Sequence, residues 1–163
     1  MMLPNLHDEL PLRSSTIHGM SVPVLTHDQR VAASAKAVAC NSQYFVAVGS
    51  YLSGSNTIAY ASNTTLNSWT TVSGIFTISG NGIAYNGKMF VAVGDGTNSI
   101  AYSYNGIVWT GLGSTIISNN TAQSGNRIYW NGTMWIVVGN GTNTIAYSSN
   151  GISWTGLGAT IFN

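Results

Sequence analysis

The strongest constraint on the fold is an apolar run that recurs at a fixed spacing of 45 residues. The run Phe45–Gly49 returns as Phe90–Gly94 and again as Trp135–Gly139. A fixed period of this length is typical of repeat proteins, in which each copy buries its apolar surface against its neighbours. The sequence therefore predicts three copies of one unit, with bounds at 37–79, 80–120 and 121–163.

Turn signals divide each copy into about four short strands. A glycine that follows Asn or Asp accepts the positive φ of a tight hairpin at low cost. The strands between these turns are rich in Val, Ile, Tyr, Trp and Thr, and no proline follows Pro23. The sequence predicts an all-β fold of antiparallel strands, with turns at Asn86-Gly87, Asp95-Gly96, Asn105-Gly106, Asn131-Gly132, Asn140-Gly141 and Asn150-Gly151.

Two architectures suit three such units, a set of β-propeller blades or a β-trefoil. Residues 45–48, 90–93 and 135–138 are apolar at every position instead of every other one. A strand with this pattern is expected to be buried on both faces, as in a blade that lies between neighbouring blades. We therefore favour three propeller-type blades with an extended N-terminal arm, and the β-trefoil is the alternative.

Two of the predicted hairpins resemble a known motif. Ser103–Trp109 and Ser148–Trp154 resemble the Asp-box hairpin of sialidase-type propellers, although here Asn directly precedes Gly and residues 61–69 of the first copy lack the pattern. The complete unit is similar to propeller-like repeats of giant DNA virus and phage proteins. The resemblance implies blades and an association with viral particles, and it carries no catalytic residues with it.

The N-terminal arm, residues 1–36, differs in chemistry from the repeats. It holds six of the nine charged residues and all three histidines, His7, His18 and His27. The histidines are too far apart for a typical metal-ligand pattern, so we predict a polar arm without a metal site. A degenerate half blade near Ser15–Val22 and a short helix from Thr26–Gln29 through Ala37 are alternative structures for the arm.

The charge content excludes several function classes. Five Lys and Arg against four Asp and Glu give a net charge of +1, which excludes a basic nucleic-acid footprint. No stretch reaches the length of a membrane helix, and the first residues lack the order of a signal peptide. We expect a protein of the virion or the host cytoplasm, without cofactor, nucleic-acid partner or membrane insertion.

Few residues of the repeats could carry catalysis. Residues 37–163 contain one acidic residue, Asp95, and one arginine, Arg127, whereas a sialidase-type hydrolase needs an arginine cluster, a general acid and a nucleophile. The loop Asp95–Asn98 is interpreted as a turn and not as a calcium site. We predict no catalytic residues, and a pocket in which Asp95 and Arg127 converge on a reactive group would contradict this prediction.

The aromatic residues of the third copy are the best candidates for ligand binding. A lectin-like site for neutral glycans would use Trp130 and Tyr129, with Asn131 and Asn140 as polar groups. Trp69, Trp109 and Trp154 are expected in the core between blades. The only cysteine, Cys40, lies in an apolar run and is predicted to be a buried structural thiol.

The number of copies creates a problem of closure. Propellers generally use 4 to 8 blades, so three blades leave two end sheets with apolar faces to cover. A second copy of the chain, a larger partner or the arm could supply the missing surface. The leading hypothesis is a non-enzymatic structural or interaction module of a viral particle, and the glycan-binding module is the alternative.

Overall fold

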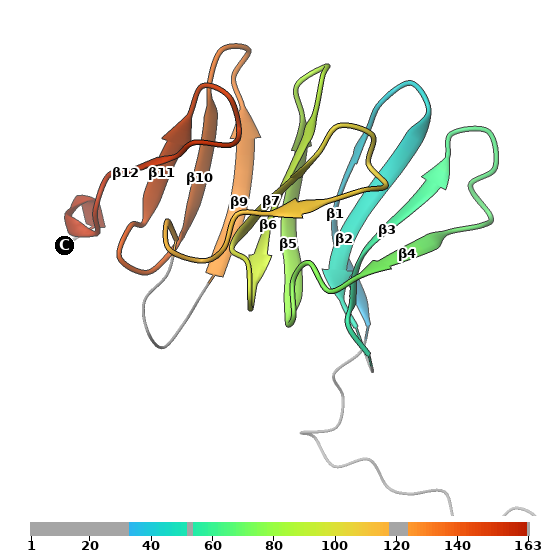
Figure 1. Cartoon of the computed structure of the whole chain (residues 1–163), viewed down its shortest axis with the longest axis horizontal. Helices are drawn as coiled ribbons and strands as arrows, with labels where there is room; N and C mark the ends of the chain where they lie inside the picture. The colour runs from blue at the N-terminus through green and yellow to red at the C-terminus, as the bar shows by residue number, and fades with distance from the viewer. Residues whose placement is uncertain (1–32, 52–53, 118–123, 163) are drawn as a thin grey trace, which may run out of the picture. The chain divides into compact units, whose positions relative to one another are not determined.

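The computed structural model describes residues 33–51, 54–117 and 124–162 (Figure 1). All of these residues lie in one compact unit, Val31–Asn163. The three histidines, the proposed half blade and the proposed helix start in the arm lie outside the described residues. Residues 34–36, which the sequence assigned to the arm, form the start of the first strand, so the strand region begins three residues earlier than predicted.

The described residues form an all-β structure. Twelve strands pair antiparallel, and a single turn of 3-10 helix, η2 (Thr160–Phe162), follows the last strand. The strands are β1 (Ser34–Cys40), β2 (Tyr44–Ser50), β3 (Asn56–Ser62), β4 (Thr70–Ser73), β5 (Ser79–Tyr85), β6 (Phe90–Asp95), β7 (Ile100–Ser103), β8 (Thr110–Gly111), β9 (Ser124–Trp130), β10 (Trp135–Asn140), β11 (Ile145–Ser148) and β12 (Thr155–Gly156).

The strands are grouped in fours. Each group is an up-and-down meander in which neighbours in sequence pair, and we name the groups repeat 1 (β1–β4), repeat 2 (β5–β8) and repeat 3 (β9–β12). Among the strand pairings of the described residues, only Ser50↔Ser79 and Asp95↔Ser124 join one repeat to the next. The three repeats together make one open antiparallel sheet, in which they follow one another in chain order (Figure 1).

The turns form as the sequence predicts. The glycines of all six predicted turns have positive φ, between 76° at Gly151 and 144° at Gly141. In the first hairpin of each repeat an asparagine side chain also holds the turn. Asn86 Oδ1 accepts hydrogen bonds from the backbone N–H of Lys88 and Met89 at 2.9 and 2.8 Å, and Asn41 and Asn131 make the equivalent bonds. In these turns, asparagine side-chain oxygens take the place of backbone carbonyl oxygens as hydrogen-bond acceptors.

The hydrophobic core consists of two separate clusters, one between each pair of neighbouring repeats. The first cluster joins repeats 1 and 2 and includes Val46, Val48, Phe90 and Ala92. The second joins repeats 2 and 3 and includes Val91, Val93, Trp135 and Val137. Because successive side chains of a strand point to opposite faces, β6 contributes alternate residues to the two clusters.

Each repeat therefore has two faces that can be named by direction along the chain. The forward face points toward the following repeat and carries the row of Val46 and Val48 in repeat 1, Val91 and Val93 in repeat 2, and Ile136 and Val138 in repeat 3. The backward face points toward the preceding repeat and carries the row of Phe45 and Ala47, Phe90 and Ala92, and Trp135 and Val137.

The prediction that the second strand is buried on both faces is correct only for repeat 2. All residues from Phe90 to Gly94 are buried. In β2 the forward residues Val46 and Val48 are buried and the backward residues are half-buried, whereas in β10 the backward residues Trp135 and Val137 are buried and Val138 is exposed. Within the part of the chain that the structure describes, repeats 1 and 3 each lack a neighbouring sheet on one side.

The prediction for Cys40 is wrong for the same reason. Its side chain is exposed. Cys40 occupies the position of Tyr85 and Trp130, which pack against the two core clusters from the backward faces of repeats 2 and 3. On repeat 1 no described residue covers that face, so an apolar position of the repeat becomes a surface thiol.

Candidate functional site

The first strand of each repeat contains one extra residue. The pairing of β1 with β2 passes from Ala35 to Ala37, and the pairing of β5 with β6 passes from Gly80 to Gly82. Lys36 and Asn81 are thus bulged residues, and Asn126 is the equivalent residue of repeat 3, where β9 and β10 also shift register. A bulge changes the direction of the side chain that it carries, and in each repeat this side chain is polar.

The bulged side chains connect neighbouring repeats. Lys36 Nζ donates hydrogen bonds to Asn81 Oδ1 and Ser79 Oγ, both at 2.7 Å. Asn81 Nδ2 in turn donates to the backbone oxygen of Gly125 at 3.1 Å. The two interfaces between repeats therefore share a polar contact at one end of the first strands, beside their apolar cores.

A polar groove of about 590 Å³ opens along these bulges. Arg127 Nη1 donates to the backbone oxygens of Asn81 and Asn126 at 3.1 and 2.7 Å, and Asp95 Oδ1 is buried without a hydrogen-bond partner. The groove is lined by Lys36, Asn81, Asp95, Ser124, Asn126 and Arg127.

Asp95 and Arg127 thus do line one groove, but the groove does not hold the components of a hydrolase. Asp95 is the only carboxylic acid side chain among the described residues, and they contain no histidine. The Ser124 hydroxyl donates to Asn126 Oδ1 at 2.6 Å and not to a general base. The cationic groups of the groove, on Lys36 and Arg127, also donate hydrogen bonds to protein oxygens. The groove offers polar contacts between repeats.

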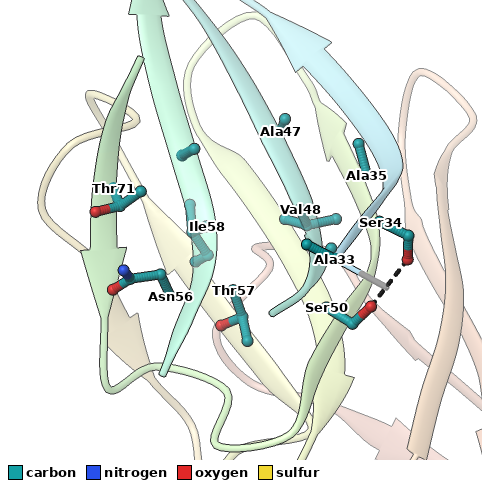
Figure 2. A pocket seen from close by; sticks show the side chains of 12 residues that line it. Ala33, Ser34, Ala35, Ala47, Val48, Ser50, Asn56, Thr57, Ile58 and Thr71 are labelled. Carbon is teal, nitrogen blue, oxygen red and sulfur yellow. Dashed lines mark hydrogen bonds between the residues drawn. The ribbon is translucent and has the colours of Figure 1, made fainter. Parts of the chain in front are cut away.

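The backward face of repeat 1 is hollow. Figure 2 shows the methyl groups of Ala35 and Ala47 beside a cavity of about 250 Å³, and the Ser34 and Ser50 hydroxyls hydrogen-bond at 2.8 Å at its margin. A second hollow continues along this face, where Val38 is 59% exposed and Trp69 is 44% exposed. The equivalent face of repeat 2 is covered by repeat 1.

The forward face of repeat 3 is apolar, and no residue in the described ranges covers it. The exposed fractions are 66% for Tyr129, 37% for Val138 and 37% for Tyr147. The equivalent residues of repeat 2, Ala84, Val93 and Tyr102, pack in or against the second core cluster. A large exposed apolar patch on a chain is typical of an interaction surface.

The four residues of the predicted glycan site do not come together. Trp130 packs against Trp135 with ring centroids 4.9 Å apart, as part of the second core cluster. Tyr129 precedes it in β9 and so points to the opposite, forward face. The strand geometry therefore separates the two aromatic rings that the sequence grouped.

The two asparagines lie at opposite ends of the β9–β10 hairpin. Asn131 follows Trp130, which pairs with Trp135, and its Oδ1 holds the turn by accepting from Thr133 and Met134. Asn140 pairs with Ser124 at the other end and accepts a hydrogen bond from Asn126 Nδ2 at 3.3 Å. Asn140 thus belongs to the region of the polar groove.

The predicted core positions of the three tryptophans are only partly correct. Trp109 is buried in the first cluster, and Trp154 packs against the second. Their indole N–H groups donate to the backbone oxygens of Gly106 and Gly151 at 3.1 and 3.2 Å. Trp69 belongs to the backward face of repeat 1 and is exposed, because that face has no neighbour among the described residues.

Sequence reasoning missed the polar groove. It examined Asp95 and Arg127 as isolated charges and gave Lys36 to the arm. A usable signal was present, because Lys36, Asn81 and Asn126 are polar and lie 45 residues apart, at the same position of each repeat. In the described ranges, no three His, Cys, Asp or Glu side chains gather as metal ligands, and no helix there is long and apolar enough to cross a bilayer.

No protein-family model and no curated protein matches the chain.

Proposed function

We propose that the chain is a non-enzymatic structural and interaction module, built as three consecutive β-propeller blades, which docks in a larger assembly. The observation that carries the proposal is the difference between repeat 2 and its neighbours. Repeat 2 is covered on both faces, whereas no described residue covers the same apolar positions on the backward face of repeat 1 and the forward face of repeat 3. Two complementary docking surfaces follow from this difference.

Several features support blades over a trefoil. Each repeat is a four-stranded antiparallel meander, and the apolar residues form two separate clusters instead of one shared interior. The proposal places the module in a viral particle, in the virion or the host cytoplasm, on the resemblance of its repeats to those of giant virus and phage proteins. The near absence of charge fits association, because little electrostatic repulsion opposes contact between neutral surfaces.

Cys40 offers a direct test of docking. It is the only cysteine in the chain and lies on the uncovered backward face of repeat 1. We expect a maleimide to react with Cys40 rapidly in the purified chain at high dilution and slowly in intact particles that contain the protein. Denaturing the particles should restore the fast reaction.

A matched control separates docking from general shielding. The double variant Cys40→Ser, Val108→Cys moves the thiol to a residue that is 70% exposed and lies in the turn between β7 and β8 of repeat 2. We expect this thiol to react rapidly in both states. Equal reactivity of Cys40 in particles and in the dilute chain would contradict the proposed function.

Binding of neutral glycans is a second candidate, favoured by the exposure of Tyr129. Aromatic rings at a neutral surface can stack on sugar rings. We expect a glycan-array signal that is lost in Tyr129→Ala and kept in Tyr104→Ala, a tyrosine of similar exposure on repeat 2. Trp130→Ala is a poor probe because Trp130 packs against Trp135. An array without signal for the unmodified chain would remove this candidate.

A further inference from the structure

The interface between two repeats has the same construction each time. On the forward side, a residue of the connection to the next repeat is fully buried, Phe76 after repeat 1 and Ile117 after repeat 2. Each lies over a glycine of the following repeat, and a Cβ built at that glycine would come within 2.7 Å of Phe76 at Gly94 and within 2.4 Å of Ile117 at Gly139.

An asparagine fixes the same connection. Asn98 Nδ2 donates to the backbone oxygen of Ile75 at 2.6 Å, and Asn143 Nδ2 donates to that of Ile116 at 2.7 Å. Each of these asparagines therefore binds the residue just before the buried Phe76 or Ile117. The interface thus combines an apolar residue over a glycine with one amide-to-carbonyl hydrogen bond.

The two ends of the described chain carry the unused halves of this interface. After repeat 3 the equivalent of Phe76 and Ile117 is Phe162, which is 73% exposed. On repeat 1 the equivalent glycine is Gly49, which lines the hollow of the backward face. The equivalent asparagine is Asn56, which is exposed and lines the same hollow (Figure 2).

We infer that a second copy of this chain docks head to tail, with the forward face of repeat 3 of one copy on the backward face of repeat 1 of the next. Phe162 enters the alanine-lined hollow over Gly49, and Asn56 Nδ2 donates to the backbone oxygen of Ile161. This inference rests on the proposed function and names its partner. Such a contact is heterologous, because the two copies use different surfaces.

The contact differs from the internal interfaces at one position. Gly80 and Gly125 face Val48 and Val93, and a Cβ at either glycine would lie 2.7 Å from the valine Cβ. Repeat 1 has Ala35 at this position, so its methyl group keeps Val138 of the docked copy further away. The contact between copies is therefore looser at this point than the contact inside one chain.

Sedimentation of the full chain over a range of concentrations tests the inference. We expect mass to increase with concentration, and we expect Val138→Lys and Ala35→Asp each to weaken association by about tenfold or more, since each charge would be buried in the contact. Val108→Lys, at an exposed residue away from both faces, should leave association unchanged. Circular dichroism would confirm that every variant is folded.

Mixing the two disrupted variants distinguishes head-to-tail docking from a symmetric contact. Val138→Lys retains an intact backward face and Ala35→Asp retains an intact forward face, so an equimolar mixture should form a two-chain species that neither forms alone. Ala35→Gly should bind itself more tightly than the unmodified chain. A monomeric unmodified chain, or a mixture that stays monomeric, would overturn the inference.

The two proposals fail in different ways. If Cys40 is shielded in particles but the purified chain stays monomeric at every concentration, the module docks on another partner or on the arm, and only the self-docking inference is wrong. If the chain associates head to tail but Cys40 reacts freely in particles, the proposed function is wrong.

Discussion

A comparison of two valines at the same repeat position tests the arrangement most directly. Val93 and Val138 lie 45 residues apart in equivalent strands, and they are 0% and 37% exposed. Only Val93 has a following repeat to cover it. Truncation to alanine at the two sites therefore makes the same chemical change in one closed and one open environment.

The magnitudes follow from these exposures. Removing two methyl groups from a buried valine loses about 1.6 kcal/mol of transfer free energy, and the cavity left at Val93 raises the total to about 2–3 kcal/mol. At Val138 about three fifths of the side chain is buried and no closed cavity forms, so Val138→Ala should cost about 1 kcal/mol. Val48→Ala, on the covered forward face of repeat 1, should resemble Val93→Ala.

Urea unfolding, followed by circular dichroism and by tryptophan fluorescence, measures both free energies. The chain must be dilute enough to be monomeric, because docking of a second copy would add stability that depends on concentration. Coincident transitions and an unchanged slope would justify a two-state comparison. Equal losses at Val93 and Val138 would refute the assignment of the forward face of repeat 3 as uncovered.

Three further predictions, on a turn, on two glycines and on a buried tryptophan, are measured by the same unfolding assay. Asn105 Oδ1 accepts hydrogen bonds from two backbone N–H groups at 2.9 Å, so Asn105→Ala should lower the free energy of unfolding by about 1–2 kcal/mol. Asn105→Asp keeps an acceptor oxygen for both bonds and should lower it much less. Gly94→Ala should lower the free energy of unfolding by about 3 kcal/mol or more, because its Cβ would lie 2.3 Å from the Ser79 oxygen. Gly113→Ala, at a φ of 73° with open space for the new methyl group, should lower it by about 1–2 kcal/mol. Trp135→Phe removes a buried indole N–H that has no partner and should stay within about 1 kcal/mol of the unmodified chain; a loss of about 3 kcal/mol would contradict that account.

The sequence allowed the repeat, its strands and its turns to be predicted because these depend on local patterns. The Asn-Gly turns and the apolar runs at 45-residue spacing need only residues close in the chain. Burial was harder to predict, because Val138 and Cys40 occupy the same repeat positions as Val93 and Tyr85, which pack in or against a core cluster. Whether such a position is covered depends on a neighbouring sheet, which no local pattern specifies.

The candidate surfaces were predictable only in outline. Unpartnered end faces follow from the count of three repeats, and the structure gives their residues. The grouping of Tyr129 with Trp130 was wrong because adjacent strand residues point to opposite faces. The polar groove depends on a shift of register at Lys36 and Asn81, and register is set by pairing across strands.

The turns held by asparagine side chains affect how the protein responds to changes in pH and ionic strength. Asn41, Asn86, Asn105, Asn131 and Asn150 fix their hairpins with neutral oxygens, and amide-to-carbonyl hydrogen bonds link neighbouring repeats beside the bonds that Lys36 and Arg127 donate. Hydrogen bonds of this kind carry no charge for protons or salt to alter. A chain built in this way would keep its shape through acidification or a rise in ionic strength, conditions that loosen proteins held together by ion pairs.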